Sequence, residues 1–380
     1  MNLRLLAEST VAALFQPAES SRWSYRTSRP TSDSVNNAAH VPQLLRERLA
    51  VELDRHAYVL NETLQVNVDA RRIVAACQSE NGVPAVAKWH DGSSVGTYAF
   101  TKSHSASEVA HFRLVSELPN VIPRGILLHE NLLLLERAGG MRVVDEWRLT
   151  PDRRGELVER IAKKISDTVP ALRRAADSRK RESATVLSER LAWLTAYGLH
   201  LKSSPGALGV THGLLLASDA QERHAALVRA FISEGDRIGS HIVPIWSSRD
   251  LDELNIHVDE SHIHIVDWDN AGLTFLSLEF AMIASRLIAL AIIDRDKRHA
   301  SHVVACFYRE LQAVAPLESA LFLISLQLHV LHLQMNPWMW PNKSSFEIRR
   351  DSLAQRALQL SHLRQWFEQE LFPTGTASPA

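Results

Sequence analysis

The chain has 380 residues, of which 46% are hydrophobic and 22% are charged, so it can fold around a sizeable core. Its formal net charge of -1 gives no overall electrostatic attraction to nucleic acid or to an anionic membrane. Two cysteines, Cys77 and Cys306, are too few for a disulfide framework, and no CxxC or His/Cys spacing typical of a zinc site is seen. We therefore expect a cytoplasmic protein that binds neither nucleic acid nor membrane.

The N-terminal part is expected to hold little regular structure. Residues 1–15 are apolar but interrupted by Arg4 and Glu8, which predicts a short amphipathic helix. Residues 17–40 are rich in Ser, Asn, Pro and Thr without periodicity, which predicts an irregular arm. A helical pattern then resumes at Val41.

A strand and a helix are predicted next. Residues 83–88 are a short apolar, partly β-branched run that ends in Lys88, which predicts a strand with a cation near its end. Residues 107–118 carry apolar side chains at helical spacing, with Glu108 in the first turn. Taken alone, Lys88 is as readily a solvated strand-end lysine, and Glu108 an acid favoured by the helix dipole.

Two further strands are predicted on either side of residue 130. The second, residues 131–136, contains four consecutive leucines, and Gly139 and Gly140 follow it closely. This pattern predicts a hairpin that leads into a glycine-containing hinge. An ordinary buried hairpin is the alternative, because leucine runs are common in cores.

Residues 150–240 are predicted to be mainly helical, since apolar side chains recur at helical spacing at 157–169, 187–194 and 225–232. The basic cluster that begins at Arg173 has acidic neighbours and is typical of a solvated helix face.

Asp250, Asn255 and Asp267 form the most informative pattern in the chain. Residues 256–258 and 262–266 alternate apolar and polar side chains around a polar turn, which predicts a hairpin that returns Asp267 towards Asn255. Carboxylate and amide oxygens are ligands that suit Mg²⁺, and a further carboxylate can orient a hydroxyl. The pattern favours phosphoryl transfer, while a polar hairpin with solvated acids is the simpler alternative.

The remaining chain is predicted to be helical. Residues 275–293 are apolar enough to mimic a membrane span, but Glu279 and Arg286 indicate a buried core helix. Trp338 and Trp340 stand between prolines further on and are candidates for substrate contact or for core anchors.

The stretch from Ser248 to Gly272 resembles the catalytic and metal-binding loops of the aminoglycoside phosphotransferase and choline kinase family. That family usually has His-Gly-Asp-x-x-x-x-Asn, a short hairpin, and then Ile-Asp-Trp-Glu/Asp-x-Ala-Gly. Residues 266–272 read Val-Asp-Trp-Asp-Asn-Ala-Gly, close to the second motif, whereas Ser-Arg-Asp at residues 248–250 departs from the first.

The resemblance implies an α+β, two-lobed protein-kinase-like fold, with a small antiparallel-sheet N-lobe and a mainly helical C-lobe. The implied domains are an N-terminal helix and arm at 1–40, a nucleotide-binding N-lobe at 41–138, and a C-lobe with catalytic loop and acceptor pocket at 139–380. The family's glycine-rich phosphate loop would fall near residues 58–75, where no glycine occurs, and Asn61 to Val68 are expected to replace it.

The resemblance also implies a role for each site residue. Lys88, held by Glu108, would contact the phosphates of ATP or GTP, and the main chain of Glu136, Arg137 and Ala138 would bind the base. The remaining roles are Asp250 as the catalytic base, Asn255 and Asp267 as Mg²⁺ ligands, and Asp252, Asp269, Trp338 and Trp340 as weaker candidates.

The expected activity is ATP-dependent transfer of the γ-phosphate to a hydroxyl of a small molecule, such as an antibiotic, sugar, amino alcohol or natural product. The alternative is a catalytically weak or inactive kinase-like nucleotide-binding or regulatory protein, which the absent glycines and the changed His-Gly would suit. A protein kinase is disfavoured, because no Asp-Phe-Gly or Ala-Pro-Glu motif follows Asp267. The sequence does not identify the acceptor.

Overall fold

The structure is a computed structural model that describes residues 32–67, 72–90, 122–129, 131–177, 181–200, 218–259, 262–268, 271–294 and 297–335. The described residues fall into two compact units. Among the described residues, the sheet unit comprises those from Ser32 to Gly140 together with those of His257–Ala271, and the helical unit comprises those of Met141–Ile256 and those from Gly272 onward.

Five antiparallel strands form the core of the sheet unit. They are β1 (Tyr58–Asn67), β2 (Arg72–Ser79), β3 (Pro84–His90), β4 (Gly125–Leu128) and β5 (Leu132–Glu136), in the order β1-β2-β3-β5-β4. On β3, Ala85, Ala87 and Trp89 are buried, whereas Lys88 points to the other face and keeps a small exposed fraction. The three strands predicted around Lys88 and the leucine run are confirmed.

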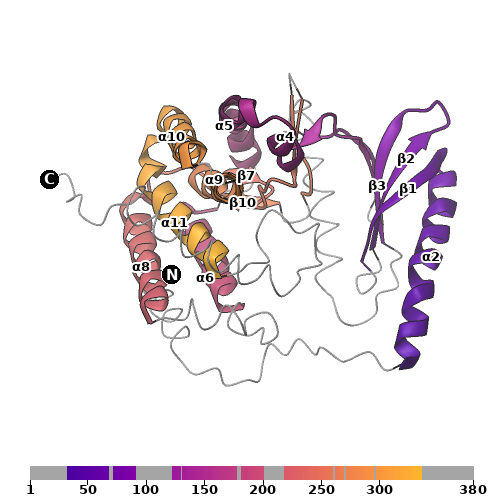
Figure 1. Ribbon diagram of the computed structural model, residues 1–380, viewed down its shortest axis with the longest axis horizontal. Coiled ribbons are helices and arrows are strands. Elements are labelled where there is room, and N and C mark those ends of the chain that lie inside the picture. Colours follow the sequence, from indigo (N-terminus) through magenta and orange to yellow (C-terminus); the bar gives the residue numbers. More distant parts are fainter. Residues whose placement is uncertain are drawn as a thin grey trace. The chain divides into compact units, whose positions relative to one another are not determined.

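A long helix, α2 (Ser32–Asp54), packs against this sheet (Figure 1). Leu45, Leu49 and Leu53 recur every four residues and are fully buried, so one face of the helix covers the sheet. The helix starts at Ser32, so the expectation of an irregular arm is wrong for residues 32–40. Ala38 and Ala39 have high helix propensity, and packing of the leucines stabilises the helix as a whole.

The predicted hairpin after Asn255 is confirmed as β8 (Ile256–Val258) and β9 (Ile263–Ile265). The first and last residues of each strand are buried and the middle one is half-buried, as period-two alternation requires. The turn is closed by the main-chain N–H of Asp259, which donates to the carbonyl of His262 at 3.1 Å.

The helical unit contains a two-stranded sheet, a two-residue strand and a set of packed helices. Its elements are β6 (Met141–Arg142), α4 (Val143–Leu149), η1 (Pro151–Arg153), α5 (Arg154–Asp177), α6 (Ser183–His200), α8 (Ser218–Ile238), β7 (Ile245–Ser247), β10 (Gly272–Thr274), α9 (Leu276–Ile293), α10 (Lys297–Val314), η2 (Pro316–Glu318) and α11 (Ser319–Met335). The helices predicted at 150–240 and 275–293 are therefore confirmed.

Helix α9 is the centre of the helical unit. It is buried over residues 276–291, and α10 and α11 both pack against it (Figure 1). The rings of Phe280 on α9 and Phe307 on α10 meet edge to face at 5.0 Å between centroids. No helix in the described ranges is long and apolar enough to cross a membrane. The chain is thus α+β, with a small antiparallel sheet and a mainly helical remainder, as predicted.

Candidate functional site

The loop that holds Asp250 and Asn255 lies in the helical unit, between β7 and β8. The side-chain amide nitrogen of Asn255 donates to the main-chain carbonyl of Asp250 at 3.0 Å and approaches its carboxylate Oδ2 at 3.4 Å. These contacts fix the amide so that its Oδ1 is the atom able to bind a cation. Two of the three polar residues that stand out in the sequence, Asp250 and Asn255, are therefore in contact in the structure.

Asp252 shapes this loop from within. Its carboxylate Oδ1 accepts the main-chain N–H groups of Leu254 and Asn255, each at 2.9 Å. Such a side-chain-to-backbone turn holds Asn255 in place. The contacts give Asp252 a structural task.

Arg249, which precedes Asp250, has a left-handed backbone with φ 60°. Its guanidinium covers Gly272 on β10, where an added Cβ would lie 2.7 Å from Arg249 Cζ. Burial lowers the pKa of Arg249, and the charges of Glu279 and Glu189 oppose this effect. A non-glycine residue in this backbone region is held only by strong surrounding contacts, and such residues gather at functional sites.

A buried ion pair stabilises the end of β7, the strand that leads into this loop. Glu279 on α9 is fully buried and accepts a hydrogen bond from Ser247 Oγ at 2.9 Å. Arg190 on α6 approaches Glu279 with its Nη2 at 3.9 Å. Burial lowers the pKa of Arg190 to about 10, so the guanidinium stays charged at neutral pH, while burial raises the pKa of Glu279. The pair connects two helices to the strand that leads into the loop.

Glu279 stands out in the sequence as a charge in an apolar helix, whereas Arg190 does not. Arg190 stands directly after Glu189, and neighbouring charges on a helix are typical of a solvated face, so no clear signal in the sequence indicates that Arg190 is buried. Its partner, Glu279, is distant in sequence.

Lys88 and Asp267 form an ion pair within the sheet unit. Lys88 Nζ lies 2.7 Å from Asp267 Oδ1, although the residues are 179 positions apart. The Lys88 side chain is only 11% exposed and that of Asp267 is 37% exposed. Lys88 is held by its strand, because β3 is paired on one side with β2 and on the other with β5.

Asp267 is fixed by its neighbours as well. Its φ of 63° lies in the left-handed region, which is uncommon for residues other than glycine. Trp268 is fully buried, its Nε1–H donates to the carbonyl of Ile265 at 2.7 Å, and its own carbonyl accepts from the N–H of Ala271 at 3.1 Å. The turn thus presents the Asp267 carboxylate on a rigid base.

The segment that the sequence predicts to be a hinge follows β5 directly, and its role as a hinge stays a prediction. Glu136 closes the strand, and its N–H donates to the carbonyl of Arg124 at 2.8 Å, while Glu136 and Arg137 are exposed and Ala138 is half-buried. Gly140 has φ 77°, and a Cβ there would lie 2.1 Å from the carbonyl oxygen of Val258. The close approach explains why this position is a glycine.

Other predicted site residues lie outside the described residues. These are Glu108, Asp269, Trp338 and Trp340, so their roles stay predictions. Of the segment expected to replace the phosphate loop, residues 61–67 form the end of β1, where Asn61 donates from Nδ2 to Gln78 Oε1 at 3.2 Å.

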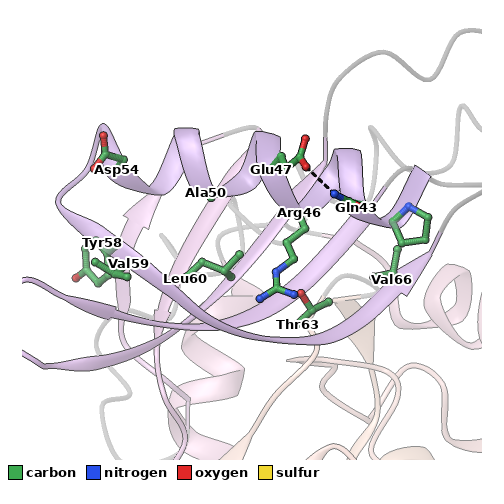
Figure 2. Close-up of a pocket in the computed structure, with 11 residues that line it drawn as sticks. Gln43, Arg46, Glu47, Ala50, Asp54, Tyr58, Val59, Leu60, Thr63 and Val66 are labelled. Carbon is green, nitrogen blue, oxygen red and sulfur yellow. Dashed lines mark hydrogen bonds between the residues drawn. The ribbon is translucent and has the colours of Figure 1, made fainter. Parts of the chain in front are cut away.

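A cavity of about 820 Å³ lies elsewhere in the sheet unit, between α2 and β1 (Figure 2). Arg46 and Glu47 from the helix and Tyr58 and Thr63 from the strand are among its lining residues. Lys88 and Asp267 do not line it. It is therefore a feature separate from the ion pair.

No protein-family model matches the chain, and no curated protein matches it significantly. Solved structures do match. An amicoumacin kinase in complex with AMP-PNP, Ca²⁺ and Ami is 14% identical, with 90% of this chain and 96% of that chain covered and a TM-score of 0.48. A microcompartment-associated aminopropanol kinase is 11% identical, with 87% and 98% covered and a TM-score of 0.49.

The macrolide 2'-phosphotransferase MphH from Brachybacterium faecium is 14% identical, with 83% of this chain and 98% of that chain covered and a TM-score of 0.46. With identities of 11–14% for these three, the activity has to be inferred from this chain's own residues. Over most of its length, the chain is similar to phosphotransferases that bear the names of antibiotics and amino alcohols.

Proposed function

We propose that the protein transfers the γ-phosphoryl group of ATP or GTP to a hydroxyl of a small molecule, with Mg²⁺ as the metal. The ion pair between Lys88 and Asp267 carries this proposal. A mostly buried lysine lies 2.7 Å from an aspartate in a left-handed turn. This supports the proposal, because phosphoryl transfer needs a cation for the phosphates close to a carboxylate for the metal.

The residues present fit a magnesium nucleotide. Asp267 offers a carboxylate and Asn255 an amide oxygen, which are the hard donors that Mg²⁺ prefers. Asp252 keeps Asn255 in position through two hydrogen bonds to the main chain. Bound Mg²⁺ would neutralise charge on the β- and γ-phosphates, which lowers the barrier to displacement.

Each residue has one task in the proposed reaction. When the nucleotide binds, the Lys88 ammonium group gives up part of its contact with Asp267 and contacts the phosphate oxygens instead. Asp250 accepts the proton of the acceptor hydroxyl as its oxygen attacks the γ-phosphorus, while the bond from phosphorus to the β–γ bridging oxygen breaks and the nucleoside diphosphate leaves. The main chain of residues 136–138 would hold the base.

The proposal includes a small-molecule acceptor and a cytoplasmic location. The cytoplasm supplies nucleoside triphosphates. Its reducing conditions also suit Cys77 and Cys306, which form no disulfide and are both buried. The acceptor is a hydroxyl compound whose identity an ADP-release screen of sugars, amino alcohols and antibiotics would determine.

The decisive experiment compares two variants with the wild type. We expect Asp250→Ala to lower turnover by about 10²–10⁴-fold, the usual contribution of a general base, with nucleotide binding nearly unchanged. Asp267→Ala should instead weaken Mg-nucleotide binding. Turnover is followed by ADP release and binding by thermal shift with ATP, with and without Mg²⁺.

The exposed acid Asp152 gives a matched control, and Asp152→Ala should behave as wild type in both assays. Wild-type turnover in Asp250→Ala would remove the catalytic assignment. Nucleotide binding by the wild type without turnover on any acceptor would favour the regulatory alternative.

A further inference from the structure

Three metal-binding side chains from two helices meet in the helical unit, and none has a task in the proposed phosphoryl transfer. Glu159 lies on α5, and His302 and Cys306 lie one turn apart on α10. His302 Nε2 is 3.3 Å from Cys306 Sγ and 3.6 Å from Glu159 Oε1. All three donor atoms lie within 4.8 Å of one another. No zinc pattern was evident in the sequence, because two residues at helical spacing are too few and the third comes from another helix.

The spacing of these donors fits tetrahedral coordination. Zinc binds nitrogen, oxygen and sulfur at about 2.0–2.3 Å, so neighbouring donors around one tetrahedral ion stand about 3.4–3.6 Å apart. The observed separations of 3.3 Å and 3.6 Å agree with this geometry. Only small side-chain shifts are needed for a shared ion.

The direction of the contacts argues against a nucleophilic triad. In such a triad the imidazole uses one nitrogen for the nucleophile and the other for the acid. Here the thiol and the carboxylate both approach Nε2 of His302. Cys306 is also only 1% exposed, which keeps its sulfur from a substrate. Donors that converge on one point suit a common ion better than a proton relay.

We propose that Glu159, His302 and Cys306 bind a zinc-class divalent cation that ties α5 to α10. A thiolate and an imidazole select zinc or a similar borderline metal over Mg²⁺, which prefers oxygen. Water occupies the fourth position. Ions reach the site from solvent, because the side chains of His302 and Glu159 are 36% and 51% exposed.

A glycine keeps one side of the imidazole open. Gly155 lies one turn before Glu159 on α5, and a Cβ there would stand 3.6 Å from His302 Nε2. At this distance a Cβ would be in van der Waals contact with the nitrogen and would occupy the space beside it. The fourth ligand therefore has room on this side.

Cobalt titration tests the site with the full-length protein after removal of metals by a chelator. A thiolate bound to Co²⁺ produces a charge-transfer band in the near ultraviolet. We expect the band in the wild type and its displacement by Zn²⁺. Cys306→Ala should abolish the band, whereas Cys77→Ala, which removes the other buried cysteine, should retain it.

Zinc affinity, measured by competition with a chromophoric chelator, gives a second readout. Loss of outer-shell partners alone typically costs 10–100-fold, so His302→Gln should weaken zinc binding by at least about tenfold. The exposed His241 gives the control variant His241→Gln. His302→Gln keeps both cysteines and decides the matter if Cys306→Ala fails to fold. No band in the wild type, or a zinc affinity unchanged in His302→Gln, would overturn the proposal. Neither readout depends on phosphoryl transfer, so a failure of the metal-site proposal would leave the proposed function untouched.

Discussion

The buried carboxyl group of Glu318 fixes one helix end in the helical unit. It lies at the end of η2, and its Oε2 accepts the main-chain N–H of Ser277 at the start of α9 at 2.9 Å. Burial raises the pKa of Glu318 to about 7, and the bond from Ser277 and the charge of Arg173 only partly oppose the shift. The contact satisfies one of the helix N–H groups that lack an intrahelical partner.

This pKa predicts a pH-dependent stability. Because the pKa in the folded chain lies above its ordinary value of 4.5, the contribution of Glu318 is complete below that value and is lost as the pH rises towards 7. Glu318→Gln keeps an acceptor for Ser277 but cannot ionise. The stability of the wild type relative to this variant should fall by about 2–3 kcal/mol between about pH 5 and pH 8. Urea unfolding at both pH values measures the difference, and a constant difference would contradict the assignment.

At the same scale, some site residues could be predicted from the sequence and others could not. The relation of Asp250 to Asn255 follows from spacing, because five residues form a compact loop. The salt bridge of Lys88 with Asp267 was not predicted as such, although both residues were. The support of Arg190 for Glu279 depends on helices that meet only in the folded chain.

Among the elements, the segment that follows β5 is constrained by the hairpin of β8 and β9. Gly140 combines a left-handed backbone with a close approach to Val258. Gly82, in the turn between β2 and β3, has nearly the same φ of 75° but no atom within 4 Å of an added Cβ. A comparison of Gly82 with Gly140 therefore distinguishes the cost of a left-handed backbone from the cost of steric overlap.

Alanine at each glycine measures these effects. Gly82→Ala should cost about 1–2 kcal/mol of unfolding free energy from the left-handed conformation alone. Gly140→Ala should cost about 1–3 kcal/mol more, because the hairpin has to move. Urea denaturation of both variants gives the comparison, and equal losses would mean that the hairpin yields without cost.

The elements most readily predicted were those with a strong local pattern. The strand ending near Lys88, the leucine strand, the hairpin after Asn255 and α9 all appear where periodicity or apolar runs place them. The start of α2 was missed, because residues 32–40 lack an apolar stripe and the helix is stabilised by leucines further along.

For the whole molecule, the decisive property is that the sheet unit is built from two separated segments of chain. Residues His257–Ala271 group with the sheet, although the residues on both sides of them belong to the helical unit. No local pattern in the sequence signals this grouping, because it arises from contacts between segments far apart. The pairing of Lys88 with Asp267 is one such contact.

A fragment that ends at Gly140 should therefore fold poorly. It lacks Asp267, which leaves the mostly buried Lys88 without this counter-charge, and it lacks the hairpin that packs next to Gly140. We expect no cooperative thermal transition by circular dichroism from this fragment, in contrast to the complete chain. A cooperative transition would show that the first segment is sufficient on its own.

The same arrangement delays completion of the sheet unit during translation. Asp267 is added 179 residues after Lys88, which at 5–20 residues per second takes roughly 10–40 s. During this interval the sheet of a nascent chain is incomplete and open to proteases and chaperones. Protease resistance of stalled nascent chains should appear only once residues 257–271 have left the exit tunnel, so the sheet unit is completed late although most of it is made first.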